Sequence, residues 1–277
     1  MHFRSIVSHI EELPSLSDTS MMVRELYKNG AENIDITRLI RTIESDPLLT
    51  VNILKMINSP LYGFSKQIAS IRQAVTLFGT HTVYGLVVKF SIESSMIANL
   101  RAYGISNTHF NAVCHMQSAL MQEWFSKISE KHANILSPLA LIMESGKLVV
   151  SQEVAHSSGI KEFLSGIKAA EFVSEYENEA FGTSSYYVSG LLFEHWNLET
   201  FYVDMLKGLD FEHDASSKLG YFIDALDVVR SAVNVKHIFT DGSVDEAVEI
   251  VEDMKLSVDD FLDAVDVIND NYQKSLS

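Results

Sequence analysis

Apolar residues recur at spacings of three and four along most of this chain, and this periodicity constrains the fold more than any other feature. A representative stripe lies on one face of a helix with 3.6 residues per turn and consists of Ile36, Leu39, Ile40 and Ile43. Asp46-Pro47 ends this segment and starts the next, because Asp caps the free N–H groups of a first helical turn and Pro suits its first position. Only 4 Pro and 13 Gly occur in 277 residues, which favours long helices.

The same pattern continues through the rest of the chain. Residues 48–58, "LLTVNILKMIN", are apolar nearly all round and are expected to be buried. Residues 70–97 indicate a capped helix, a break at Gly79 and a further apolar helix. Helical patterns also fill residues 105–200 and the C-terminal segment. Because no segment shows strand alternation, an internal repeat or a low-complexity linker, the sequence predicts an all-α, multi-helix domain.

The net charge of −16 is distributed unevenly. Residues 1–100 carry 9 Lys and Arg against 9 Asp and Glu, whereas residues 101–277 carry 12 against 28. Phosphate backbones and anionic membrane surfaces are bound by Lys and Arg, so this balance argues against nucleic acid and membrane partners. The acidic C-terminal segment is interpreted as a solvated helical surface.

The single cysteine, Cys114, cannot form an internal disulfide, which suits a reducing cytoplasm, and it is interpreted as a buried structural residue. The N-terminal residues lack the long apolar stretch of a signal peptide. No segment is expected to reach the roughly 18 uncharged apolar residues that a membrane span needs. The chain is therefore expected to be cytoplasmic.

A cluster of residues between positions 46 and 79 resembles the signature of the HDOD family, the HD-related output domains of bacterial signalling. The matching positions include Asp46, Pro47, Asn58, Ser59, Tyr62, Gly63 and Gly79. Leu13-Pro14 fits the usual opening of the family. The residues themselves also have structural interpretations, since Asn58 suits a helix end in the left-handed conformation and the two glycines suit turns.

The resemblance implies an HD-like helical bundle with three parts. The HDOD domain is expected over residues 8–215, with an N-terminal helical lobe at about 8–100 and an HD-like lobe at about 105–215. An acidic C-terminal helical extension, residues 216–277, is expected to pack on it.

The segment "LIMESGKLVV", residues 141–150, bears on whether the chain is an enzyme. In HD-type metal phosphohydrolases the same frame carries His-Asp before Gly-Lys, and these side chains hold divalent metals that activate water. Here Glu144-Ser145 replaces the His-Asp pair. Since Ser is a poor substitute for a bridging carboxylate, the centre of the metal site is predicted to be lost. Lys147 is expected to cap the preceding helix or to lie in solvent.

The rest of the ligand set is placed by resemblance alone. His115 takes the position of the first His, although Cys114 aligns nearly as well and the choice stays open. A later His is replaced by Ser185, with Ser184 as the alternative. The positions of the vestigial HD site are then His115, Glu144, Ser145, Lys147, Ser185 and, on a later helix, Asp224 or Asp227. The real His-Asp dipeptide, His213-Asp214, lacks the surrounding frame and is interpreted as an acidic loop.

Three functions remain open at this point. The leading hypothesis is a non-catalytic regulatory domain that binds other signalling proteins, without a resident metal, cofactor or catalytic residue. The second is a sensor that binds a nucleotide or another small molecule in the vestigial pocket. The third is a phosphohydrolase with an altered ligand set using His115, Glu144 and one of the two aspartates. The sequence does not identify the partner, and it leaves open whether the chain forms a homodimer.

Overall fold

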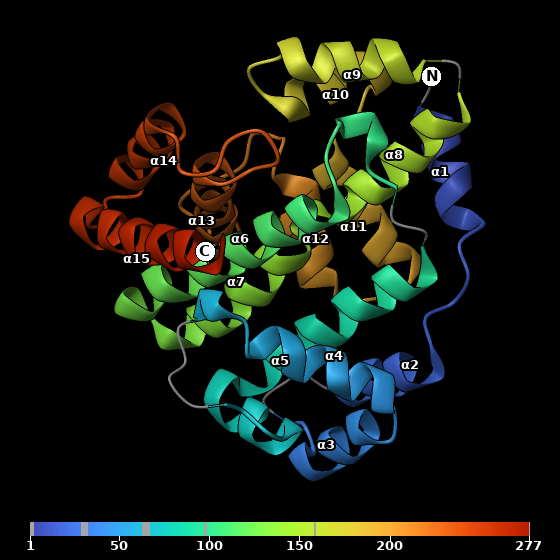
Figure 1. Ribbon diagram of the computed structural model, residues 1–277, viewed down its shortest axis with the longest axis vertical. Helices are drawn as coiled ribbons and strands as arrows, with labels where there is room; N and C mark the ends of the chain where they lie inside the picture. The colour runs from blue at the N-terminus through green and yellow to red at the C-terminus, as the bar shows by residue number, and fades with distance from the viewer. Residues whose placement is uncertain (1–2, 29–32, 63–66, 97–98, 158, 277) are drawn as a thin grey trace.

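The computed structural model describes residues 3–28, 33–62, 67–96, 99–157 and 159–276, and helices dominate it (Figure 1). Within these residues the only β pairing is an isolated antiparallel bridge between Val233 and Ile238. The prediction of an all-α fold is confirmed.

The N-terminal part consists of short helices arranged around one long helix. Its elements are α1 (Phe3–Glu11), α2 (Asp18–Tyr27), α3 (Ile36–Glu44), α4 (Pro47–Ile57), the 3-10 helix η2 (Pro60–Tyr62) and α5 (Ile71–Ser95). Helices α2, α3 and α4 all pack on α5, as the lower part of Figure 1 shows. Helix α5 in turn packs on α7 of the next part and so joins the two.

The middle part carries the "LIMESGKLVV" segment. Its elements are η3 (Arg101–Tyr103), α6 (Asn107–Ile128), α7 (Glu130–Ile142), η4 (Met143–Ser145), α8 (Gly146–His156), α9 (Ile160–Ala169), α10 (Val173–Phe181), α11 (Ser185–His195) and α12 (Thr200–Gly208). Helices α6 and α7 form a long antiparallel pair, and α11 packs against both α8 and α12.

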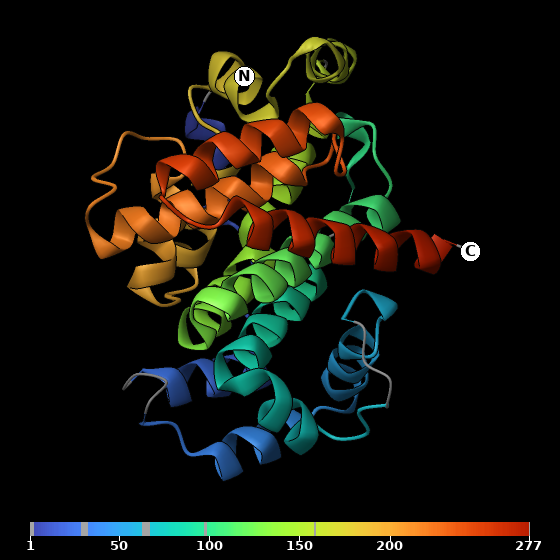
Figure 2. The same cartoon turned by 90° about the vertical axis from the view of Figure 1, so that its left-hand side faces the viewer.

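Three helices form the C-terminal part: α13 (Lys218–Ala232), α14 (Asp241–Asp253) and α15 (Val258–Leu276). Helix α13 packs on α6, α7 and α12, and α14 covers α13. Helix α15 crosses the outside of α6 and reaches η2 in the N-terminal part (Figure 2). The boundaries of the three predicted parts stay a prediction, because their buried side chains belong to one hydrophobic core that extends from Ile6 to Ile268.

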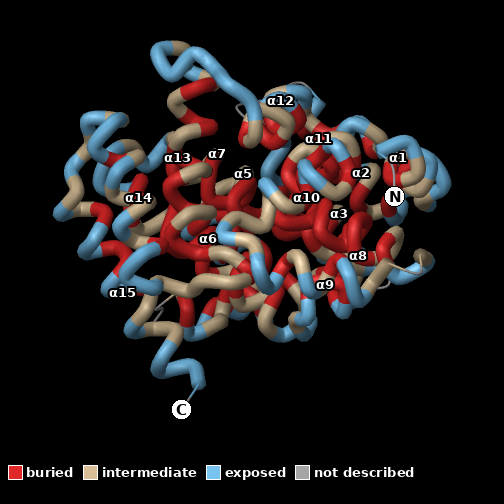
Figure 3. Tube along the Cα trace, turned by 90° about the horizontal axis from the view of Figure 1, so that it is seen from above, coloured by how far each residue is buried: buried red, intermediate tan, exposed pale blue. Residues whose placement is uncertain are grey.

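The core explains why two segments are as long and apolar as membrane spans. The helical segments Ile71–Ser95 and Glu130–His156 are both long and apolar enough to span a membrane, contrary to the expectation from sequence. Of their most apolar windows, 67% and 89% are buried inside the protein. Figure 3 shows many buried residues, in red, along α5, α7 and α8. This burial fits core helices of a soluble protein.

Most of the family-signature residues have local structural roles. Asp46 caps α4 by accepting a hydrogen bond from the Leu49 N–H at 3.0 Å, and Pro47 is the first helical residue, as predicted. Gly79 breaks α5 with φ 77° and ψ 169°, again as predicted. Gly63 lies outside the described residues.

Asn58 ends α4 as expected, but the left-handed conformation proposed for it is wrong, since its φ is −85° and its ψ is 9°. Its side chain instead bonds both backbone groups of Ile68, at 2.8 and 2.9 Å. Nearby, the Ser59 hydroxyl accepts from the Leu61 N–H at 3.5 Å, and the Tyr62 ring packs edge-on against Phe78. The segment is therefore tied down by internal contacts.

Helix α4 is only half buried, so the expectation of full burial is wrong. Ile53 and Ile57 face the core, but Leu48 is 71% exposed and Val51 is 59% exposed. The main packing partners of the helix among the described residues are α5 and α3, and its outer face is exposed to solvent. The all-round apolar pattern thus reflects an exposed apolar surface rather than an interior helix.

Candidate functional site

The "LIMESGKLVV" segment forms a continuous helical path and not a turn. Helix α7 passes through η4 directly into α8, and Gly146 has an ordinary helical φ of −61°. Glu144 and Lys147 are three residues apart on this path and therefore lie on the same face. The expectation that Lys147 caps a helix or lies in solvent is wrong, because the helix continues and turns its side chain inward.

Glu144 and Lys147 form a fully buried ion pair. The Lys147 Nζ lies 2.5 Å from the Glu144 Oε2, and the two side chains are 1% and 0% exposed. The other carboxylate oxygen, Oε1, accepts hydrogen bonds from Gln117 Nε2 at 2.8 Å and from the Tyr186 hydroxyl at 3.0 Å. Lys147 also donates to the Ser185 Oγ at 2.9 Å. Each charge is thus paired and hydrogen-bonded, as burial requires.

The pair is ionised on both sides. Burial alone would raise the pKa of Glu144, but the ammonium of Lys147 and the hydrogen bonds from Lys147, Gln117 and Tyr186 bring that pKa below its usual value. Burial would likewise lower the pKa of Lys147, but the Glu144 carboxylate raises it above its ordinary value. Both groups therefore keep their charges at neutral pH.

A second carboxyl group lies next to this pair. Glu177 accepts from the Tyr103 hydroxyl at 2.6 Å and from the Ser185 N–H at 2.6 Å, and it is fully buried. Burial raises the pKa of Glu177, although the Lys147 ammonium acts in the opposite direction. The raised pKa favours the neutral form of Glu177. We call the set Gln117, Glu144, Lys147, Glu177, Ser185 and Tyr186 the buried centre.

Close contact between α8 and α11 seals the buried centre. A Cβ atom at Gly146 would overlap the carbonyl oxygen of Ser185, so only glycine permits this approach. The Gly146 N–H donates to the Ser189 Oγ at 2.7 Å, and that hydroxyl donates to the Met143 carbonyl at 2.7 Å. The glycine of the Gly-Lys frame therefore serves helix packing and not a turn.

Tyr186 is the member of the buried centre that contacts Arg230 of the C-terminal helix α13. Its ring centroid lies 4.3 Å from the Lys147 Nζ and 4.6 Å from the Arg230 Cζ, so two cations contact one ring. Arg230 also pairs with Asp210 at 2.9 Å and with Asp227 at 2.5 Å. Gln117 adds a further link, since its Nε2 donates to the Val233 carbonyl at 2.8 Å.

The structure brings together only some of the predicted vestigial HD positions. Glu144, Lys147 and Ser185 meet in the buried centre, and Ser145 lies beside them with its hydroxyl bonded to the Ile142 carbonyl at 2.6 Å. The two aspartates do not join them. Asp224 pairs with His213 at 2.8 Å near the surface, and Asp227 pairs with Arg230.

On α6, the partner of Glu144 is Gln117 and not His115. His115 and Gln117 are two positions apart, and residues at this spacing on a helix point about 200° apart. His115 therefore faces away from the ion pair. Burial and the nearby Lys89 ammonium lower the pKa of His115 to about 3. Cys114 lies one turn from Gln117, and burial raises its thiol pKa to about 12, with smaller effects from Lys89 and Glu144 among others. A thiol with this pKa suits a structural role.

The donor set does not fit the divalent metal that HD-type enzymes hold. A metal ion at Glu144 would lie against the buried Lys147 ammonium, which already occupies the carboxylate at 2.5 Å. The other residues around Glu144 contribute an amide, two hydroxyls and one carboxyl with a raised pKa. Among the described residues, no group of three or more His, Cys, Asp or Glu side chains is arranged to hold a metal.

Several residues of the buried centre were not found from the sequence. Gln117, Glu177, Tyr186 and the adjacent Arg230 come from four helices that the sequence separates widely. One signal was available, because Glu144 and Lys147 are an acid and a base at i, i+3 within an apolar run. This spacing predicts a buried ion pair.

The chain matches one family model. A model described as the HDOD domain matches residues 13–209. Curated proteins give no match.

Several solved structures share the fold. A virulence factor from Campylobacter jejuni is 22% identical, with a TM-score of 0.59, and the match covers 97% of this chain and 99% of that one. A candidate phosphohydrolase from Shewanella amazonensis is 15% identical, with a TM-score of 0.69 and coverage of 99% and 98%. A candidate signal transduction protein from Marinobacter aquaeolei is 17% identical, with a TM-score of 0.71, and covers 96% of this chain and 59% of that one.

Proposed function

The chain belongs to the HDOD family, and we propose that it is a non-catalytic regulatory domain that acts by binding other signalling proteins. The observation that carries the proposal is the Glu144–Lys147 ion pair. The resemblance implies that Glu144 stands where HD-type enzymes carry a metal ligand, and here the Lys147 ammonium lies 2.5 Å from its carboxylate without access to solvent. A sealed centre cannot admit a phosphate ester, so this region serves as a scaffold.

The surface of α4 supports action through protein contacts. Leu48 and Val51 lie three residues apart on its outer face and are 71% and 59% exposed. Exposed apolar side chains that lie together on one face are typical of surfaces that bind another protein. The N-terminal segment around α4 is also the part of the chain where charges balance, which suits apolar docking.

The similar structures support the regulatory assignment at the level of fold. One of them is described as a candidate signal transduction protein and another as a virulence factor. We further propose that the domain acts in a bacterial cytoplasm, which its single, unpaired and buried cysteine supports. A nucleotide sensor using the buried centre has less support, because Glu144, Lys147 and Glu177 fill that space with their own contacts.

Two measurements test the proposal. The first compares hydrolysis of bis-p-nitrophenyl phosphate in Mn²⁺ by the wild type and by the Glu144→Gln/Lys147→Met variant, together with the metal content of both proteins. We expect no metal-dependent rate in either. Stoichiometric metal and a rate that the variant loses would contradict the proposal.

The second measurement compares partner profiles from proximity labelling in cells. The Leu48→Ser/Val51→Ser variant should lose specific partners that the wild type labels. The matched control is Leu262→Ser/Val267→Ser on α15, which removes two exposed apolar side chains elsewhere. Identical profiles for the wild type and both variants would argue against α4 as the contact surface.

A further inference from the structure

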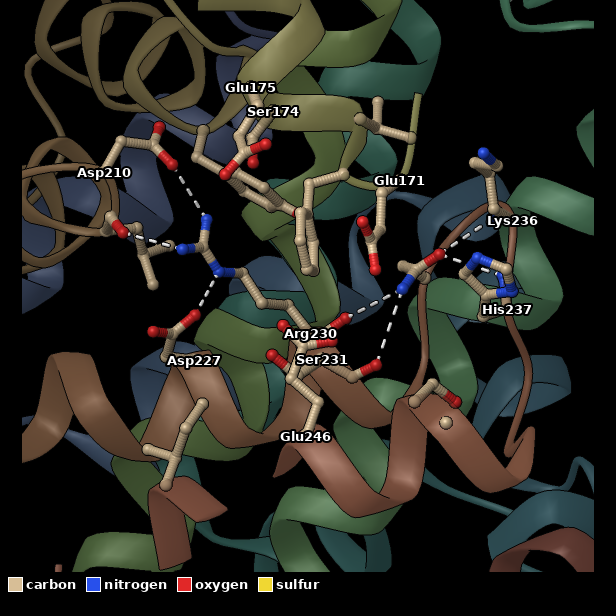
Figure 4. A pocket seen from close by; sticks show the side chains of 18 of the residues that line it. Glu171, Ser174, Glu175, Asp210, Asp227, Arg230, Ser231, Lys236, His237 and Glu246 are labelled. Carbon is tan, nitrogen blue, oxygen red and sulfur yellow. Dashed lines mark hydrogen bonds and ion pairs between the residues drawn. The ribbon is translucent and has the colours of Figure 1, made fainter. Parts of the chain in front are cut away.

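A cleft outside the buried centre has features of a ligand site. It lies between the start of α10, the end of α12, helix α13, the segment 234–240 and helix α14, and its volume is about 780 Å³ (Figure 4). This volume falls within the usual range for pockets that bind small molecules. The C-terminal helices form one side of the cleft, so the extension creates it. The inference does not depend on the proposed function.

The cleft carries more negative charge than its own cations neutralise. Arg230 pairs with Asp210 and Asp227 on one side, as Figure 4 shows. Lys236 points its ammonium at the backbone carbonyl of Ala170 and so forms no ion pair with a described carboxylate. Three further carboxylates line the cleft without a basic partner among the described residues: Glu171, Glu175 and Glu246.

Two of these carboxylates, Glu171 and Glu246, come from different elements and are close enough for the charge of Glu171 to act on Glu246. Burial first, and then the charges of Asp227 and Glu171, raise the pKa of Glu246, while Arg230 acts in the opposite direction. Figure 4 shows Glu171 and Glu246 on opposite sides of the cleft. Like charges held across a cleft repel, and a cation between them would remove this cost.

The walls of the cleft include aromatic and aliphatic side chains. Tyr186 and Phe172 both line it, together with Leu209 and Ile250. The ring of Tyr186 already attracts Arg230, at 4.6 Å from its centroid. Apolar walls with acidic groups at separated points favour a ligand that has a carbon chain and more than one positive charge.

We propose that this cleft binds a small organic polycation of the polyamine class, whose ammonium groups pair with Glu171 and Glu246 and whose carbon chain packs on Phe172 and Ile250. A bare divalent metal fits less well. No group of three or more metal-ligating side chains is arranged for one in the described part of the chain. The cleft is also far larger than a single hydrated ion needs.

The test uses spermidine as the probe and isothermal titration calorimetry of the full chain at low salt. The Glu171→Gln/Glu246→Gln variant should weaken binding at least tenfold. The matched control is Glu252→Gln/Asp253→Asn, which also removes two carboxylates, both from α14, at exposed positions that do not line the cleft. We expect the control to change the affinity less than threefold.

Each other outcome overturns the proposal. Equal loss in both variants would mean that the acidic surface attracts spermidine without a site. If Mg²⁺ displaced spermidine from the wild type at the same ionic strength, and bound with the same affinity as spermidine, the cleft would recognise charge alone. No heat of binding by the wild type at millimolar spermidine would mean that the cleft does not take this class of ligand. Circular dichroism of each variant verifies that it is folded.

Discussion

Lys147 and Arg230 contact the same aromatic ring, yet they lie in very different regions. Lys147 is 1% exposed and has one carboxylate partner, whereas the Arg230 side chain is 15% exposed and has two. The side chains of the buried centre are at most 5% exposed, whereas Arg230 borders a cleft that solvent can enter and that Tyr186 also lines. The comparison teaches that a charge from which water is excluded depends wholly on its partners in the chain, whereas a charge beside a cleft can also be solvated.

The largest expected effect is that of Lys147→Met. The substitution keeps the length of the side chain but leaves Glu144 buried without its counter-charge, which costs about 3–5 kcal/mol in unfolding free energy. Urea denaturation measures the loss. In the Glu144→Gln/Lys147→Met double variant, most of it should return. A loss below about 1 kcal/mol in the single variant would show that the centre is open to water.

The next effect concerns how tightly the two regions are packed. Gly146→Ala should destabilise the protein by about 2 kcal/mol, because its methyl group would overlap the Ser185 carbonyl across the α8–α11 contact. Gly242→Ala is the matched control, since Gly242 lines the cleft and its added methyl group would meet no atom within 4 Å. Thermal unfolding compares the two. Equal changes in the melting temperature of the two variants would contradict the tight packing at Gly146 and the open space at Gly242.

A smaller loss is expected when Arg230 is replaced. Arg230→Met leaves Asp210 and Asp227 without their cation, but both can gain water from the cleft. The expected cost is about 1–2 kcal/mol, between the values for buried and for exposed pairs. Urea denaturation of Arg230→Met and of Lys147→Met under the same conditions gives the ratio of the two losses in unfolding free energy. A loss as large as that of Lys147→Met would mean that the cleft is as dry as the centre.

The smallest effect is a gain in stability from Glu246→Gln. The folded state raises the pKa of Glu246, so ionisation of this group opposes folding as the pH rises above its unfolded value of 4.5. Removal of the carboxyl should therefore stabilise the protein by about 0.5 kcal/mol at pH 7, after allowance for solvent screening. The gain should vanish below pH 4. Unfolding curves at both pH values check this, and a gain independent of pH would contradict it.

The same contrast shows what the sequence could reveal. Local rules predicted the helices and their ends, as at Asp46 and Gly79, because those depend on nearby residues. They failed at α4, where the apolar pattern did not reveal that Leu48 and Val51 face solvent. Burial depends on which helices pack together, and residue spacing alone does not determine this.

The buried centre was predictable in part for the same reason. Glu144 and Lys147 are close in sequence, and their spacing contains the information for an ion pair. Gln117, Tyr186 and Glu177 approach them only through the packing of α6, α11 and α10. Family resemblance pointed to His115, which is two residues from Gln117 and therefore on another face of α6. The cleft could not be foreseen, because its lining comes from α10, α13 and α14 together.

The central claim is that the chain supplies its own cation where HD-type enzymes hold a metal. A crystal structure determined after soaking in Mn²⁺, with anomalous scattering data, tests this most directly. The account predicts that the Lys147 Nζ stays within hydrogen-bonding distance of Glu144 and that no anomalous peak lies in the buried centre. A manganese ion bound to Glu144, with Lys147 displaced, would contradict it.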